Sequence, residues 1–233
     1  MTCPVIHLAS FDAAAEEHRD HADIWHTVSR RVASGVGAEH VIVAPVDDAA
    51  DGWIRDVRNR FDPIAAAIPA HFTLVYPFAA DIDAGSLGKH MTTALAAFSS
   101  FPVTLAGVSG SDGCYLRYDI KDGNDILIAM HDQLYAGPLE CHLDLYESFQ
   151  PHLTLGRIDD PASWRAALRE LSTTAPRMTT IVRRVISYRR YTDGTRLIDN
   201  NVQLRHAPGH GPQGAPGAAA SASRSGCPDP STS

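Results

Sequence analysis

The chain has 233 residues, 44% of them hydrophobic and 20% charged, and its formal net charge at pH 7 is −7. These values are ordinary for a folded domain with a core. The acidic balance excludes a general nucleic-acid coat protein, which would be basic, but it leaves room for one RNA end in a local basic cleft. No apolar stretch approaches the ~20 residues of a membrane span, and residues 1–30 lack the pattern of a secretory signal. The four cysteines are scattered and favour reduced thiols, so we expect a cytoplasmic protein. We also expect it to be a monomer.

Residues 1–38 form a predicted N-terminal helical extension, because apolar residues recur there at helical spacing up to about Ser34. His18 and His21 in this segment are three residues apart and could approach a metal ion together. No carboxylate or thiolate stands at ligand spacing beside them. A metal-dependent hydrolase using these two histidines stays an alternative, and we assign no metal site and no cofactor.

The next segments alternate between strand and helix patterns. The first half of the domain is predicted to contain, in order, a strand at 41–46, a helix at 48–61, a strand at 71–78 and a helix at 85–99. The second half is predicted to contain strands at 101–108 and 113–120 joined by a hairpin turn at 109–113, a helix at 124–136, a strand at 151–158 and a helix from 160.

Residues 178–204 read as strands joined by a turn at Thr192-Asp193-Gly194. From 207 to 233, 21 of the 27 residues are Ala, Gly, Pro or Ser, a composition that predicts a disordered tail. The order strand, helix, strand, helix occurs at about 41–99 and again at about 114–173. This repetition predicts an α+β class and a duplicated bilobal domain over 39–206, with two antiparallel sheets flanking a central cleft and helices on the outer faces.

Two of the predicted strands carry the same motif, His-x-Thr-Leu. It starts at His71 in the first half and at His152 in the second. The composition predicts roughly 0.05 such matches by chance, so two are unlikely to arise from composition alone. Side chains alternate between the faces of a strand, so His71 shares a face with Thr73, and His152 shares one with Thr154. We expect both pairs to face the cleft.

Two imidazoles at one cleft suit general acid–base catalysis. A histidine pKa near 6.5 allows one ring to be neutral and the other protonated near neutral pH. The neutral ring can accept a proton from the attacking oxygen while the protonated ring donates one to the leaving oxygen. The paired threonines Thr73 and Thr154 can donate hydrogen bonds to phosphate oxygens that carry the charge of the transition state. Which histidine is the base cannot be read from the sequence.

The two motifs, about eighty residues apart in a duplicated α+β frame, resemble the two-histidine (2H) phosphoesterase superfamily, in its bacterial branch related to 2′-5′ RNA ligases. This resemblance implies metal-independent hydrolysis of a 2′,3′-cyclic phosphodiester at an RNA end or on a nucleotide, with reversible 2′-5′ RNA ligation as a further activity. It implies that His71 and His152 are catalytic and that Thr73 and Thr154 bind phosphate. A non-catalytic nucleotide- or phosphate-binding module on the same fold is the alternative.

Three further features bear on substrate binding. Arg157 suits bidentate phosphate contact, but strand alternation places it on the face opposite His152 unless Gly156 bends the strand. Seven arginines and two aspartates lie between Arg177 and Arg205, either at the cleft or on a solvated edge. Tyr76 and Tyr188 are candidate base-stacking groups, with core packing the stronger expectation for Tyr76.

Overall fold

The structure is a computed structural model that describes residues 38–46, 51–112, 114–146 and 148–206. The helix predicted within 1–38, with His18 and His21, lies outside the described residues, as do the predicted tail at 207–233 and the predicted start of the helix at 48. The boundaries predicted for the extension, the domain and the tail therefore stay predictions.

Eight strands and four α-helices make up the described part of the chain. The strands are β1 (Glu39–Pro45), β2 (His71–Phe78), β3 (Phe101–Ser111), β4 (Tyr115–Asp122), β5 (His152–Arg157), β6 (Met178–Val182), β7 (Arg184–Arg190) and β8 (Arg196–Gln203). The helices are α2 (Asp51–Phe61), α3 (Ala84–Ala94), α4 (Asn124–Tyr135), α5 (Pro161–Thr174) and the short 3-10 helix η2 (Gly137–His142). Each strand and helix pattern predicted between 41 and 204 corresponds to one of these elements, and the α+β class is confirmed.

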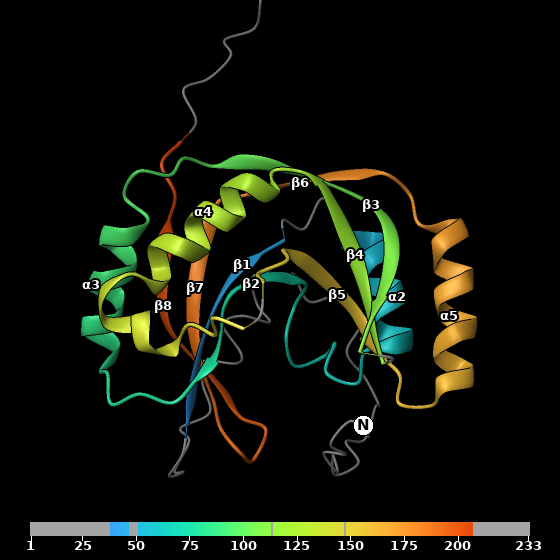
Figure 1. Cartoon of the computed structure of the whole chain (residues 1–233), viewed down its shortest axis with the longest axis horizontal. Coiled ribbons are helices and arrows are strands. Elements are labelled where there is room, and N and C mark those ends of the chain that lie inside the picture. The colour runs from blue at the N-terminus through green and yellow to red at the C-terminus, as the bar shows by residue number, and fades with distance from the viewer. Residues whose placement is uncertain (1–37, 47–50, 113, 147, 207–233) are drawn as a thin grey trace, which may run out of the picture.

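All eight strands belong to one sheet in the order β6-β3-β4-β5-β2-β1-β7-β8, and every pairing is antiparallel. The sheet is strongly curled, with α3 on the left beside β8 and α5 on the right beside β3 (Figure 1). The two motif strands β2 and β5 lie at its centre, and Phe72 opposite Leu153 is the register of their pairing. The prediction of two separate sheets is therefore corrected, because this contact joins the two four-stranded halves edge to edge.

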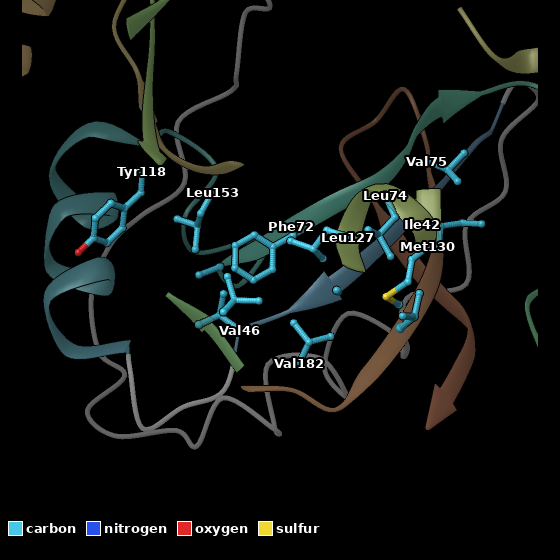
Figure 2. Packing of buried hydrophobic residues seen from close by; sticks show 14 of the residues in the cluster. Ile42, Val46, Phe72, Leu74, Val75, Tyr118, Leu127, Met130, Leu153 and Val182 are labelled. Atoms are coloured by element: carbon cyan, nitrogen blue, oxygen red, sulfur yellow. The ribbon is translucent and has the colours of Figure 1, made fainter. Parts of the chain in front are cut away.

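The four α-helices pack on one face of the sheet. Each helix contributes residues to a single core cluster, for example Ile54 of α2 and Met91 of α3. Figure 2 shows the central strands supplying Phe72 and Leu153 to the same core as Leu127 and Met130 of α4. The apolar side chains of β2 and β5 thus point to the face that the helices cover. The side chains that alternate with them point to the other face of the sheet. None of the described helices is long and apolar enough to cross a bilayer.

Several element boundaries differ from the predicted ones, and two of them differ most. The helix predicted to reach residue 99 ends at Ala94, where the Leu95 N–H bonds the Met91 carbonyl; Ser99 instead forms a parallel bridge with Arg205. The strand predicted to end at 108 continues to Ser111, so the hairpin turn is shorter than expected. Asp112 forms this turn at a φ of +54°, a left-handed conformation that Asp tolerates better than most residues.

Candidate active site

The pairing of β2 with β5 brings the two motifs together. Phe72 and Leu153, the middle residues of the motifs, are directly opposed. In an antiparallel pair the neighbours of such a contact are adjacent too, so His71 lies beside Thr154 and Thr73 lies beside His152. Because Phe72 and Leu153 are buried on the helical side, both histidines and both threonines lie on the opposite side. We call this side the histidine face.

A β-bulge follows the threonine of each motif. Along β2, Thr73 and Val75 pair with consecutive residues of β1, so Leu74 is an extra residue. Along β5, Thr154 and Gly156 pair with consecutive residues of β4, which makes Leu155 the extra residue. A bulge reverses the alternation of the side chains that follow it. The sixth residue of each motif strand, Tyr76 or Arg157, therefore returns to the histidine face.

The bulge in β2 is held by side chains of α4. The ring Nδ1–H of His131 donates to the Leu74 carbonyl at 2.8 Å, and the Tyr135 hydroxyl accepts from the Tyr76 N–H at 3.2 Å. These bonds satisfy backbone groups that a bulge withdraws from the ladder. His131 and Tyr135 are thus positioning residues for the first motif.

The bulge in β5 is held by a close approach of α2. A Cβ atom added to Gly156 would lie 2.6 Å from both the Cβ and the carbonyl oxygen of Phe61, the last residue of α2. Only glycine allows that approach without displacing backbone. Each motif strand is therefore supported by a helix of the other half. The second-half helix α4 supports β2, and the first-half helix α2 supports β5.

Both imidazoles are anchored in the same way. Nδ1 of His71 lies 2.8 Å from the Pro69 carbonyl, and Nδ1 of His152 lies 2.7 Å from the Gln150 carbonyl, in each case two residues upstream. A carbonyl only accepts, so each Nδ1 carries the proton and donates. Within the described part of the chain neither Nε2 atom has a hydrogen-bond partner. Each ring is therefore fixed in one tautomer with Nε2 available for proton transfer.

The two histidines differ in acidity. Burial lowers the pKa of His71 from 6.5 to about 4; the Pro69 hydrogen bond opposes this shift, while the charges of Arg58 and His152 add to it. Burial also lowers the pKa of His152, with the Gln150 hydrogen bond opposing. That the charge of His152 is felt at His71 agrees with the adjacency of the motifs. His71 is neutral over the whole neutral range.

A buried ion pair, which the sequence did not reveal, supports the loop that precedes His71. The Arg58 guanidinium donates to Asp62 at 2.7 Å and to the Ile68 carbonyl at 2.7 Å, and the side chains of Arg58 and Asp62 are each only 6% exposed. Asp62 in turn accepts from the Ile64 N–H at 3.1 Å. The pair therefore fixes the loop that delivers Pro69 and His71 to the site.

The two strands that flank the motifs give the histidine face two different walls. On β4, Arg117 is opposite Thr154 and Asp119 is opposite His152, and directly opposed residues share a face. On β1, the equivalent positions opposite Thr73 and His71 are Val43 and Pro45. Val43 belongs to a second, smaller apolar cluster: Val41, Val43, Ile68, Ile186 and Tyr188. One wall is charged and the other apolar.

Arg157 lies on the histidine face and not on the opposite face that simple alternation predicts, because the bulge at Leu155 shifts the alternation just before it. It pairs with Tyr115, which alternates with Arg117 and Asp119 along β4. Its guanidinium lies 5.8 Å from the centre of the Tyr115 ring and forms an ion pair with Asp159 at 3.1 Å. Its side chain therefore stands at the end of the site where β5 stops.

The arginine-rich segment contributes less free charge than the sequence indicates. Carboxylates pair with several of its members: Arg177 with Asp122, Arg189 with Asp199, and Arg190 with Glu39. The tyrosines also exchange the roles expected for them. Tyr188 is only 5% exposed and packs in the second cluster, whereas Tyr76 is 42% exposed, so the expectation that Tyr76 packs in the core is wrong.

Sequence reasoning missed Arg117 and Asp119. The alternation of β4 was recognised through its apolar side chains at Leu116 and Tyr118, which are fully buried. The same alternation places Arg117 and Asp119 on the other face. Only the pairing of β4 with β5 could show that this face is the one carrying His152, and strand order is not written in a single sequence.

Comparisons with known proteins find similar sequences and structures. Inferred phosphoesterases of Geobacillus kaustophilus (strain HTA426) and Geobacillus thermodenitrificans (strain NG80-2) are 32% and 34% identical over 105 and 108 residues, 43% of this chain. The chain spans 58% of the length of each. Two solved structures superpose at low identity: a phosphoesterase (17%, TM-score 0.46, 73% of this chain and all of that one) and E. coli LigT in its apo form (16%, TM-score 0.49, 72% and 98%).

A family model decides the assignment. Residues 45–194, which include both motifs and both bulges, match the model of the 2′-5′ RNA ligase superfamily. This match covers more than half of the chain and confirms the resemblance drawn from the two motifs. The chain belongs to the 2′-5′ RNA ligase superfamily, the two-histidine phosphoesterases.

Proposed function

We propose that the protein hydrolyses a 2′,3′-cyclic phosphodiester, on an RNA end or a nucleotide, by acid–base catalysis with His71 and His152 and without a metal cofactor. The observation that carries this proposal is the matched anchoring of the two rings. Each Nδ1 donates to a carbonyl two residues upstream, and each Nε2 remains available at the junction of β2 and β5. The family supports a phosphoesterase activity of this kind.

The reaction is a displacement at phosphorus. Nε2 of His71 accepts a proton from water as the water oxygen bonds to phosphorus. The bond from phosphorus to one ribose oxygen breaks, and protonated Nε2 of His152 donates its proton to that oxygen. The hydroxyl groups of Thr73 and Thr154 donate hydrogen bonds to the non-bridging oxygens, where charge accumulates. A 5′-hydroxyl in place of water would give a 2′-5′ linkage by the same proton transfers.

The roles of the two histidines follow from their surroundings. His71, with a pKa lowered by burial to about 4, is neutral and suits the base. His152 faces Asp119 across the ladder, and this carboxylate opposes the lowering of the His152 pKa by burial and by Arg117. A phosphodiester anion bound between the rings raises the pKa of His152 further, because a nearby negative charge favours the protonated ring. His152 is therefore the acid.

An aromatic group at one end of the site fits a nucleobase. The exposed Tyr76 ring meets Phe149 edge-on at 6.3 Å, and Phe149 stacks on His131 at 3.8 Å. Phe149 stands just before β5, so this group is on the His152 side of the motifs. Stacking on aromatic rings tolerates any base, which suits a substrate recognised mainly through its phosphate.

The direct test is turnover of 2′,3′-cyclic nucleotides and cyclic-ended oligonucleotides in the presence of EDTA, with the products identified by ³¹P NMR. We expect ring opening to a nucleoside monophosphate. Binding without ring opening under any condition would favour the alternative, a non-catalytic phosphate-binding module. Activity that EDTA abolishes would favour a metal-dependent hydrolase instead.

A further inference from the structure

Arg117 stands at the centre of the charged wall described above. In the antiparallel ladder it is directly opposite Thr154, one of the two threonines proposed to contact phosphate. Side chains of directly opposed residues have Cβ atoms about 4.5–5.5 Å apart, and an arginine side chain is long enough to extend well past its neighbour. The Arg117 side chain is therefore long enough for its guanidinium to contact an oxygen bound by Thr154.

The guanidinium of Arg117 has no protein partner among the described residues. Its Nε is buried without a hydrogen-bond acceptor. Asp119, the carboxylate two residues along the same face, is engaged elsewhere: it accepts from the Ser109 hydroxyl at 2.6 Å and contacts Lys121 at 3.5 Å. Leaving a buried charged donor unsatisfied costs free energy. An arginine kept in that condition at a functional site is the arrangement expected of a residue that receives an anion.

Neighbouring arginines provide a contrast within the same sheet. Arg157, on the same face, is held by Asp159, and Arg189 on β7 is held in two-point contact by Asp199. The position equivalent to Arg117 in the other half of the sheet is Val43, which is fully buried in the second apolar cluster. Of the two described positions directly opposite Thr154 and Thr73, the one on β4 therefore carries a positive charge and the one on β1 does not.

We propose that Arg117 is a phosphate-binding residue of this site, which takes a non-bridging oxygen of the substrate together with Thr154. The identity of that phosphate, a ribose cyclic phosphate, rests on the proposed function; the anion site itself does not. Because the opposite wall is apolar, the non-bridging oxygens are drawn toward β4. This fixes which way the phosphodiester faces between His71 and His152, and it gives the site a requirement for an anionic ligand.

The test compares Arg117→Met with wild type in thermal unfolding and calorimetric titration, using inorganic phosphate and adenosine 2′-monophosphate as probes. Methionine keeps an apolar stem of similar length and removes the guanidinium. Phosphate should raise the melting temperature of wild type, and the affinity for both probes should fall about 10–100-fold in Arg117→Met, the loss expected for a hydrogen bond to a charged group. Arg165→Met, an exposed arginine of α5, is the matched control and should behave as wild type.

The same experiment separates a binding role from a structural one. Because the buried Nε of Arg117 has no acceptor without ligand, Arg117→Met should melt at or above the wild-type temperature in phosphate-free buffer. Guanidinium ion added to Arg117→Ala should restore part of the phosphate affinity. The proposal is overturned by an Arg117→Met protein that is unstable without phosphate, or by one that binds both probes as wild type does. Failure of the proposed function is a separate result, namely phosphate binding without turnover of the cyclic nucleotide.

Discussion

Phe72 and Leu153 face each other across the junction of β2 and β5, and this contact organises the candidate site. Each is the central residue of a His-x-Thr motif, and each is buried against the helices. Their pairing sets His71 beside Thr154 and His152 beside Thr73. The two halves of the sheet therefore share one site at their seam, and neither half holds a complete set of these groups.

The pH dependence of kcat/KM should be bell-shaped and centred on the acidic side of neutrality. The acid His152 must be protonated, and its pKa is lowered from 6.5, so activity falls as the pH rises through that lowered value. The base His71 must be neutral, so activity falls again as the pH drops toward about 4. We expect the maximum of kcat/KM below pH 6.5. The two apparent pKa values of the profile belong to the coupled pair of histidines and not to either residue alone. A profile that is flat from pH 5 to 9 would contradict paired acid–base roles.

The lowered pKa of His71 also predicts how stability depends on pH. Between pH 6.5 and about 4 the unfolded chain binds a proton at this histidine that the folded chain does not. The stability due to the neutral, buried ring is present above pH 6.5 and is lost as the pH falls toward 4. Urea unfolding at several pH values should show a smaller acid loss in His71→Gln than in wild type. His206→Gln, at an exposed position, is the control and should lose as much as wild type.

Breaking the buried ion pair should destabilise the fold strongly. Arg58→Ala leaves Asp62 buried without its partner, which typically costs about 3–5 kcal/mol of unfolding free energy. Replacing both residues, as Arg58→Met with Asp62→Leu, removes both charges and should cost less than the single change. Denaturant titration measures both effects. Equal losses in the single and the double variant would show that the pair does not act as a unit.

The close approach of α2 to β5 makes Gly156 sensitive to the smallest substitution. Gly156→Ala places a methyl group 2.6 Å from Phe61 backbone and should destabilise by about 1–3 kcal/mol, as overpacking does. Gly52→Ala in α2 is the matched control, since nothing lies within 4 Å of the added methyl. It should be neutral or stabilise by up to about 1 kcal/mol, because alanine favours a helix. An unchanged melting temperature in Gly156→Ala would show that the helix end moves freely.

Local patterns carried most of the element predictions. The alternation of apolar and polar residues identified the apolar faces of β4 and β5, and helical spacing located α2, α4 and α5. Strand alternation also placed the two histidines and two threonines correctly on one face, because it depends only on residues next to each other in the chain. The doubt about Arg157 was resolved by the bulge at Leu155, whose presence depends on the register with β4.

Features set by pairing between distant segments were beyond the sequence. The single sheet depends on the edge-to-edge contact of Phe72 with Leu153, and Arg117 enters the site only because β4 is the neighbour of β5. The buried pair of Arg58 and Asp62 looked like part of an ordinary helix end followed by a proline. In each case the sequence gives the type of each residue in the deciding contact, but it does not tell which distant residue lies beside it.

The central claim is that His71 and His152 act as one unit on one phosphorus atom. The most direct measurement is kcat for a 2′,3′-cyclic nucleotide in EDTA with His71→Ala, His152→Ala and the double variant, with His206→Ala as the control and circular dichroism to verify folding. Each single change should lower kcat by about 10²–10⁴-fold, and the double change should cost little more than either alone, as in other groups that act together. Folded single variants that keep the turnover of wild type would contradict the account.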